Sequence, residues 1–239
     1  MHNVVIIPAR GGSKGIPKKN IINLNGLPLI AYTIKAAINS GGLIDRIIIS
    51  TDDNQIAEIS REYGGEVFMR SESLSTDTAS THDVLIDISN TLDKQNYKVD
   101  NLITLQPTSP LRDENHIKEA INLFCKNKIA DSLVSCIQVP HIFHPYSVMK
   151  LSKEGFLNNF IKDAPSISRR QDKQVVFARN GAAIYITRFN RINNYIFGGK
   201  ILPFFMKPED SIDIDSFEDL KKIEKILQDR NAKNSKLRK

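Results

Sequence analysis

Short runs of apolar, often β-branched residues alternate with helix-like segments through the first 139 residues. Such runs occur at Val4–Ile7, Ile47–Ile49, Val67–Met69, Leu102–Leu105 and Leu133–Val139. Apolar runs of this length suit strands that are buried on both faces, as in a parallel sheet. The alternation of strand and helix therefore predicts an α/β fold with a doubly wound, mostly parallel sheet and helices on both faces.

The helices are expected in the stretches between these runs, where apolar residues recur at helical spacing. They should cover Pro28–Ile38, about Gln55–Tyr63, about His82–Lys94, and a segment that begins after Asp113. Asp52 and Asp53 precede the second of these helices. They could touch a substrate, but capping of the helix is the favoured interpretation because a carboxylate there accepts bonds from free N–H groups.

The loop after the first run is rich in glycine and cations. The first strand should end at Pro8, which cannot continue a central ladder. R-G-G-S-K-G at residues 10–15 follows, with Gly11, Gly12 and Ser13 at its centre. Glycines let backbone N–H groups turn toward a ligand, and cations favour a polyanion. The pattern indicates a phosphate-binding loop, and a basic surface turn is the alternative.

Two further polar loops follow predicted strands. Residues 70–81 are rich in hydroxyl groups, and Q-P-T-S-P-L-R occupies residues 106–112. The prolines fix the backbone of the second loop, so that four side chains can point at a ligand: Gln106, Thr108, Ser109 and Arg112. Because ligands of such sheets bind at the carboxyl ends of strands, we expect all three loops to converge on one crevice.

Two carboxylates alternate with isoleucines in S-I-D-I-D at residues 211–215. If this segment is a strand, Asp213 and Asp215 face the same side. Two hard oxygen ligands suit Mg²⁺ or another divalent cation. Capping of the following amphipathic helix by Asp215 is the alternative, and the spacing does not separate the two.

The β-α rhythm breaks after Pro140. Tyr146–Leu151 and Phe156–Ile161 flank Lys153-Glu154-Gly155, which predicts a hairpin. We expect one domain over residues 1–230, with 140–174 inserted in it as an arm and 231–239 as a basic flexible tail. That tail holds four of the six formal net positive charges.

Composition narrows the function classes. Without a basic face that carries aromatic residues, nucleic-acid binding is not expected. Apolar runs are too short for a membrane span and no signal peptide is recognisable, so a cytoplasmic protein with no membrane partner is expected. The two cysteines, Cys125 and Cys136, are expected to be buried free thiols.

Five stretches together resemble the acylneuraminate cytidylyltransferase (CMP-sialic acid synthetase) family, over about residues 4–227. They are I-P-A-R-G-G-S-K-G-I-P-K-K-N at 7–20, R-x-x-x-L-x-x-D-x-A-S at 70–80, L-Q-P-T-S-P-L-R at 105–112, R-R-Q-D at 169–172 with R-N-G-A-A-I-Y-I at 179–186, and S-I-D-I-D. The fold implied is that of the nucleotide-diphospho-sugar transferases. In that family S-I-D-I-D is the metal motif.

The resemblance implies roles for individual residues. Arg10 and Lys19 fall at positions that bind the triphosphate, and Gln106 at one that contacts the sugar. Positions that contact the cytidine correspond to Asn20, Arg70, Ala79 and Thr81, the last often serine in the family. Arg170 falls where the family binds the sugar carboxylate, with Arg169 adjacent; a solvated charge is the alternative for either. The catalytic set implied is Lys19, Arg170, Asp213 and Asp215.

The function implied is transfer of CMP from CTP to the anomeric hydroxyl of a sialic-acid-like nonulosonic acid. N-acetylneuraminate, legionaminic acid and related acids all remain candidates. A different nucleotidyl- or glycosyltransferase, or an inactive nucleotide-sugar-binding regulator, is the alternative. A comparable arm makes the dimer in the family, so a homodimer with Arg170 near the sugar site is expected. Spacing identifies no general base.

Overall fold

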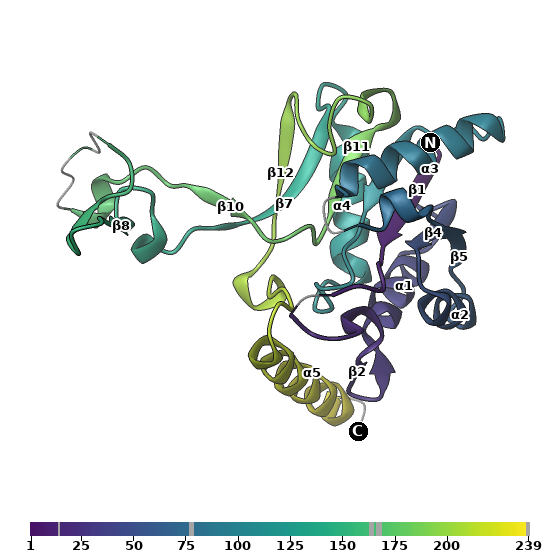
Figure 1. The fold of residues 1–239 in the computed structure, drawn as a ribbon, viewed down its shortest axis with the longest axis horizontal. Coiled ribbons are helices and arrows are strands. Elements are labelled where there is room, and N and C mark those ends of the chain that lie inside the picture. Colours follow the sequence, from purple (N-terminus) through teal and green to yellow (C-terminus); the bar gives the residue numbers. More distant parts are fainter. Residues whose placement is uncertain (14, 77–78, 163–164, 166–168, 238–239) are drawn as a thin grey trace.

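A sheet of eight strands forms the centre of the molecule (Figure 1). The computed structural model describes residues 1–13, 15–76, 79–162, 165 and 169–237, with backbone alone for Glu72, Arg170 and 233–237. The strands run in the order β10-β7-β11-β6-β1-β4-β5, and β12 pairs with β7. Their bounds are β1 Asn3–Pro8, β4 Arg46–Thr51, β5 Glu66–Met69, β6 Asn101–Thr104, β7 Ser132–Gln138, β10 Phe177–Arg179, β11 Tyr185–Arg188 and β12 Ile201–Phe205.

The predicted parallel core is confirmed. Strands β1, β4, β5 and β6 pair in parallel, and β12 is parallel to β7. Only β10 and β11 run against their neighbours. The carboxyl ends of β1, β4, β5 and β6 therefore meet at one edge of the sheet, where the three polar loops begin.

Helices cover both faces of this sheet, and β1 explains why its residues are apolar throughout. Val5 and Ile7 pack in the cluster that includes helices α1 (Leu29–Asn39), α2 (Asn54–Glu62) and α4 (Glu114–Lys126). Val4 and Ile6 pack in the opposite cluster with α3 (Thr81–Lys94). Each face of the strand is thus buried, as a doubly wound sheet requires.

The last helix, α5 (Phe217–Leu237), lies beside the carboxyl ends of the sheet (Figure 1). Its Leu220 and Ile223 pack with Ile16 of the first loop, Leu111 of the third and Ile214. The helix runs past residue 231 as far as Leu237, so it includes most of the segment that is predicted to be a basic flexible tail. None of the helices in the described ranges is long and apolar enough to cross a membrane.

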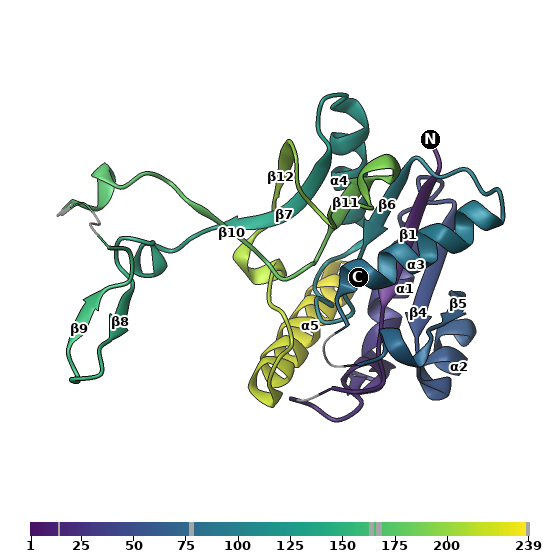
Figure 2. The same ribbon diagram turned by 45° about the horizontal axis from the view of Figure 1, so that its top comes forward.

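The arm leaves the body between β7 and β10 and projects away from it (Figures 1 and 2). Its tip is the predicted hairpin, with β8 (Met149–Leu151) antiparallel to β9 (Leu157–Asn159). Gly155 has φ 85° in the connecting turn, a conformation that favours glycine. The strands are shorter than predicted, and the return of the arm through β10 was not predicted.

Candidate active site

The first loop is fastened to the end of β4. The N–H of Gly11 donates to Asp52 Oδ1 at 2.8 Å, and a Cβ added to Gly11 would lie 2.8 Å from Asp53 Cβ. Only glycine fits this close approach. Asp53 accepts from the N–H groups of Gln55 and Ile56, so it caps α2 as predicted. Asp52 therefore secures the loop while Asp53 secures the helix.

Lys19 joins the end of this loop to the aspartate segment. Its Nζ donates to the carbonyl of Ile214 at 2.7 Å and lies 3.2 Å from Asp215 Oδ1. The side chain is 13% exposed, so one cation is held between the loop and the segment with little contact with water. Asn20, which is buried, donates to the Arg10 carbonyl at 2.9 Å. These bonds fix the backbone around the predicted triphosphate site.

Arg70 is the first residue of the second loop, and its side chain bonds to β4. Its Nε and Nη2 donate to the hydroxyl and carbonyl oxygens of Ser50, each at 2.8 Å. Burial lowers the pKa of Arg70, and the charge of Asp52 acts in the other direction. Arg10 Nη1 donates to the Thr76 carbonyl at 3.4 Å, which brings the first and second loops together. The guanidinium of Arg70 is thus positioned by β4 instead of by its own loop.

The third loop reaches the aspartate segment. Ser109, which is buried, donates through its hydroxyl to Asp213 Oδ1 at 3.2 Å. The N–H of Ile214 donates to the Thr108 carbonyl at 2.9 Å. The loop that follows β6 therefore holds one of the two predicted metal ligands.

Contrary to the prediction, the side chain of Arg112 does not line the cleft. It is 1% exposed, and its Nη2 donates to Thr33 Oγ1 at 2.7 Å and to the Gln106 carbonyl at 3.4 Å. Burial lowers its pKa to about 10. Its Nε and Nη1 have no hydrogen-bond partner among the described residues. The side chain therefore joins Thr33 of α1 to the Gln106 carbonyl at the start of the third loop.

The aspartate segment, residues 211–215, lies outside the strands of the described structure, so the condition under which both carboxylates would face one side is not met. Asp213 and Asp215 still alternate with isoleucines that pack against α5. Burial raises the pKa of Asp213, as does the charge of Asp215, while hydrogen bonds from Thr108 and Ser109 and the charge of Lys19 lower it. Instead of a sheet ladder, the Ile214 N–H bonds to the Thr108 carbonyl, and the Ile214 carbonyl accepts from Lys19 Nζ.

Ser216, and not Asp215, caps α5. The Ser216 hydroxyl accepts from the Asp219 N–H at 3.2 Å, and Asp219 accepts from the Ser216 N–H at 2.9 Å. This reciprocal pair is a capping box. Asp215 has an 82% exposed side chain. The capping interpretation of Asp215 is therefore wrong, and its carboxylate is available to a ligand.

The three loops and the aspartate segment enclose one cleft of about 450 Å³. Of the predicted site residues, ten line it: Arg10, Ser13, Lys19, Asn20, Arg70, Ala79, Thr81, Gln106, Thr108 and Asp215. The predicted residues Gly11, Gly12, Ser109 and Asp213 are not among its lining residues, although Asp213 accepts from Ser109, next to the lining residue Thr108. The side chain of Arg170 lies outside the described residues.

The chain matches the cytidylyltransferase family over residues 4–237. It belongs to that family. An N-acylneuraminate cytidylyltransferase of Streptococcus agalactiae serotype V is 38% identical over 223 residues, which cover 92% of this chain and 52% of that protein. A pseudaminic acid cytidylyltransferase of Campylobacter jejuni is 44% identical over 129 residues, or 54% of this chain and 55% of that protein. The chain spans about half the length of these curated relatives.

One solved structure shows the cytidylyltransferase fold independently of sequence. A CMP:2-keto-3-deoxy-manno-octonic acid synthetase complexed with CTP matches with a TM-score of 0.72 at 17% identity, over 96% of this chain and all of that one. The expected fold class is confirmed.

Sequence reasoning missed four residues that line the cleft: Pro8, Gly15, Ser80 and Val84. A Cβ added to Gly15 would lie 2.7 Å from the Asp215 carbonyl, so this glycine permits the first loop to approach the aspartate segment. Ser80 caps α3 through a capping box with Asp83, and the sequence S-T-H-D carried that signal. Nothing local distinguishes Val84 from the core residues of the same helix.

The donors around Asp213 and Asp215 are compatible with a hard cation. No group of three or more His, Cys, Asp or Glu side chains suited to a metal occurs in the described ranges. Mg²⁺ needs no such cage, because it usually takes one or two carboxylates and completes its shell with water and substrate phosphate. A carboxylate pair beside a cleft lined by Arg10 and Lys19 fits that requirement.

Proposed function

We propose that the chain transfers CMP from CTP to the anomeric hydroxyl of a sialic-acid-like nonulosonic acid and releases pyrophosphate. The observation that carries the proposal is the cleft itself. Three cations, Arg10, Lys19 and Arg70, line it together with the exposed carboxylate of Asp215. A polyphosphate needs the cations, and a metal ion that bridges its phosphates needs the carboxylate.

The cleft also has room and polar groups for the rest of the two substrates. Asn20, Ala79 and Thr81 line it near Arg70, where the cytidine would bind. Gln106 and Thr108 line it from the third loop, where the sugar would bind. The relative from C. jejuni is named for pseudaminic acid, so that acid belongs among the candidate substrates together with N-acetylneuraminate and legionaminic acid.

The reaction would be an in-line displacement at the α-phosphorus. The sugar oxygen forms the new P–O bond, the bond between the α-phosphorus and the bridging oxygen breaks, and pyrophosphate leaves. Arg10 and Lys19 would neutralise the triphosphate and orient it, which is the main protein contribution in phosphoryl and nucleotidyl transfer. A divalent cation bound by Asp213 and Asp215 would supply further charge neutralisation. The described lining residues include no histidine, so the acceptor of the hydroxyl proton stays unassigned.

The proposal includes a homodimer formed by the arm. Large apolar side chains of the hairpin are exposed, among them Leu151, Phe156, Leu157 and Phe160. Surfaces of this kind are usually covered by a partner, and pairing of identical arms covers two such surfaces at once. In such a dimer Arg170 would stand close to a sugar site, in its own subunit or in the neighbour.

Product formation tests the proposed function directly. The purified chain would be incubated with CTP, Mg²⁺ and a panel of nonulosonic acids, and CMP-sugar and pyrophosphate would be measured. We expect turnover with at least one of these acids, no turnover in excess chelator, and a strong preference for CTP over ATP. Full turnover with chelator would contradict the metal assignment, and equal use of ATP would contradict the cytidine assignment.

A further inference from the structure

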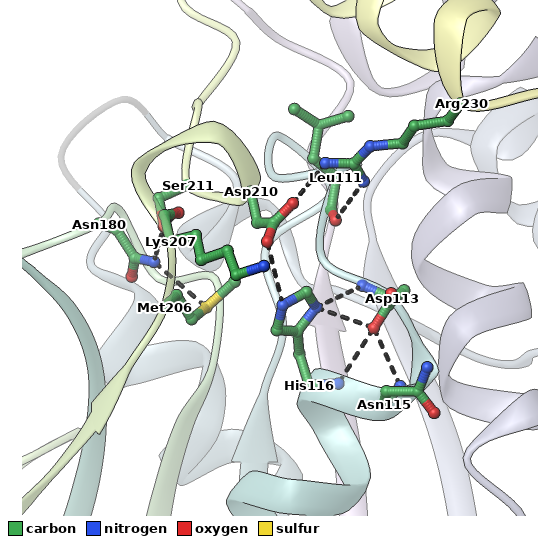
Figure 3. Close-up of polar contacts among 10 residues, drawn as sticks. All are labelled: Leu111, Asp113, Asn115, His116, Asn180, Met206, Lys207, Asp210, Ser211 and Arg230. Atoms are coloured by element: carbon green, nitrogen blue, oxygen red, sulfur yellow. Dashed lines mark hydrogen bonds and ion pairs between the residues drawn. The ribbon is translucent and has the colours of Figure 1, made fainter. Parts of the chain in front are cut away.

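Asp210 occupies a buried position three residues before the aspartate pair. It ends the short 3-10 helix η6 (Pro208–Asp210) and is 9% exposed. Its carboxylate lies in a cluster that two other elements supply (Figure 3). Arg230 of α5 donates through Nη2 to Asp210 Oδ1, and His116 Nε2 of α4 lies 3.5 Å from Oδ2. A buried carboxylate is costly unless it is paired, so these contacts define where Asp210 can lie.

The partners of Asp210 are themselves fixed. Arg230 Nη1 also donates to the Leu111 carbonyl at 3.4 Å, at the end of the third loop. His116 Nδ1 lies 2.8 Å from Asp113 Oδ1 at the start of α4. The same guanidinium thus bonds the third loop and the segment that leads to the aspartate pair (Figure 3). These two elements meet at Asp213, which accepts from the Ser109 hydroxyl.

The next residue is held from the opposite side. Ser211 Oγ accepts from Asn180 Nδ2 at 2.9 Å and donates to the Lys207 carbonyl at 2.8 Å. Asn180 is buried, and its Oδ1 accepts from Ser135 at 2.6 Å. The chain is therefore fixed at residues 210 and 211 (Figure 3), before it reaches Asp215 in the cleft.

Such fixing matters because the aspartate segment has no sheet ladder to set its place. The two carboxylates also repel each other, which contributes to the raised pKa of Asp213. Their relative position must be set by the surrounding structure, as a precise site requires support from a second layer of contacts. None of the residues of the Asp210 cluster is among the residues that line the cleft.

We infer that Asp210 is a positioning residue for the metal-binding pair. Asp210 is held by Arg230 and His116, and it sets the path of residues 211–215 so that Asp213 and Asp215 can bind one divalent cation together. This role rests on the proposed function, because that function supplies the cation.

The test compares Asp210→Asn with Glu209→Gln. Glu209 is the neighbouring residue, is exposed, and undergoes the same change from carboxylate to amide. Asp210→Asn weakens both ion pairs, so we expect the Mg²⁺ concentration for half-maximal CMP transfer to rise about tenfold or more. The KM for CTP at saturating Mg²⁺ should stay within about twofold of the parent chain. Glu209→Gln should change neither quantity.

Hydrogen exchange supplies a readout that needs no turnover. The Ile214 amide donates to Thr108, and it should exchange faster in Asp210→Asn but not in Glu209→Gln, measured on peptides that span 207–216. Should Asp210→Asn fold poorly, Arg230→Lys keeps the charge and Arg230→Met removes it; only the second should reproduce both effects.

The inference requires both changes. An unaltered Mg²⁺ requirement, unaltered exchange, or a uniform fall in kcat with a lower Tm alone would overturn it and leave Asp210 as an ordinary stabilising residue. If the parent chain shows no CMP transfer, the proposed function fails, and unaltered exchange in Asp210→Asn would then overturn the positioning role separately.

Discussion

The body and the arm of this molecule use apolar residues in opposite ways. In the body, every residue of β1 is buried, and α3 and α4 cover the faces of the sheet. In the arm, Leu151 and Phe156 are each 70% exposed and Leu157 is 62% exposed. The body therefore has its own core, whereas an isolated two-stranded hairpin is marginal in water.

This difference means that the body and the arm depend on different sources of stability. The body can be stabilised by burial within one chain, whereas the arm gains burial only from something outside itself. The cleft belongs to the body, since its loops start from β1, β5 and β6. Under the proposed function, the arm would still affect the cleft through Arg170 and through a partner that covers its apolar surface. The predictions below test this division.

The largest expected effect is the loss of a core side chain. Phe124 of α4 is 0% exposed, and Arg188 lies over its ring with the guanidinium carbon 4.3 Å from the centroid. Phe124→Ala should lower the free energy of unfolding by about 3–5 kcal/mol. The matched change Phe156→Ala in the arm should cost less than about 0.5 kcal/mol within one protomer. Urea unfolding at two protein concentrations measures both; equal losses would contradict the division.

Asp215→Asn should remove activity without unfolding the body. We expect kcat to fall by at least about 10²-fold, or about 3 kcal/mol of barrier, because a proposed ligand of the divalent cation is lost. Tm should change little, since the side chain is exposed and Ser216 caps the helix. Glu218→Gln in the first turn of α5 is the control. A large fall in Tm with activity preserved per folded molecule would make Asp215 a structural residue.

A charge on the arm should break the proposed homodimer. Leu157→Glu places a carboxylate on an exposed apolar position of β9, and burial of an unpaired charge in an interface is costly. Light scattering at micromolar concentration should then report a mass near that of one chain instead of two. Asn158→Glu, the adjacent residue that points to the other face of β9, should leave the dimer intact. A parent chain that is monomeric and fully active would refute the dimer.

Arg170→Ala tests whether the arm contributes to the sugar site. Only the sugar acid offers a carboxylate to this position, and charged hydrogen bonds contribute about 1.5–3 kcal/mol. The KM for the sugar acid should therefore rise about tenfold or more, with little change in the KM for CTP. Steady-state kinetics with each substrate varied in turn measures this. Unchanged sugar kinetics would shift the assignment to Arg169, tested by the same substitution.

The elements of the body could be predicted because their patterns are local. Apolar runs and helical spacing located β1, β4, β5, β6, β7 and the five helices, with ends that differ by a few residues. The short hairpin β2–β3 (Asn23–Leu24 and Leu27–Pro28) was missed although its turn, Asn25-Gly26, has φ of 49° and 85° as such turns require.

Features that depend on distant residues could not be predicted in this way. Arg112 is polar and lies among ligand-binding residues in the sequence, yet tertiary packing directs it toward Thr33. The alternation of aspartates and isoleucines correctly indicated that Ile214 is buried and that Asp215 is exposed, but Asp213 is also partly buried, against Ser109 of the third loop. The cluster around Asp210 joins residues from α4, η6 and α5, and no short motif contains them together.

The smallest expected effect is a dependence of stability on pH at His116, in the body. Its pKa is raised, first by the hydrogen bond with Asp113 and also by the charges of Asp210 and Glu119; Arg230 faces it across Asp210. A raised pKa means that the charged form stabilises the fold fully below the unfolded value near 6.5, and that this contribution is lost as the pH rises through the folded value. The pKa of Asp113 is lowered to about 2, so its share is present above the unfolded value near 3.8 and is lost as the pH falls toward 2.

His116→Gln should therefore destabilise the chain more at pH 5.5 than at pH 8.5. The difference should stay below about 1 kcal/mol, because Asp113 is partly exposed and water screens the pair. His141→Gln, at an exposed position of the arm, is the matched control and should show no such difference. Urea unfolding at the two pH values measures both variants. An equal effect of His116→Gln at both pH values would mean that the neutral ring already makes the stabilising contacts. In that form Nε2–H faces Asp210, and Nδ1 accepts from the Asp113 N–H at 3.2 Å.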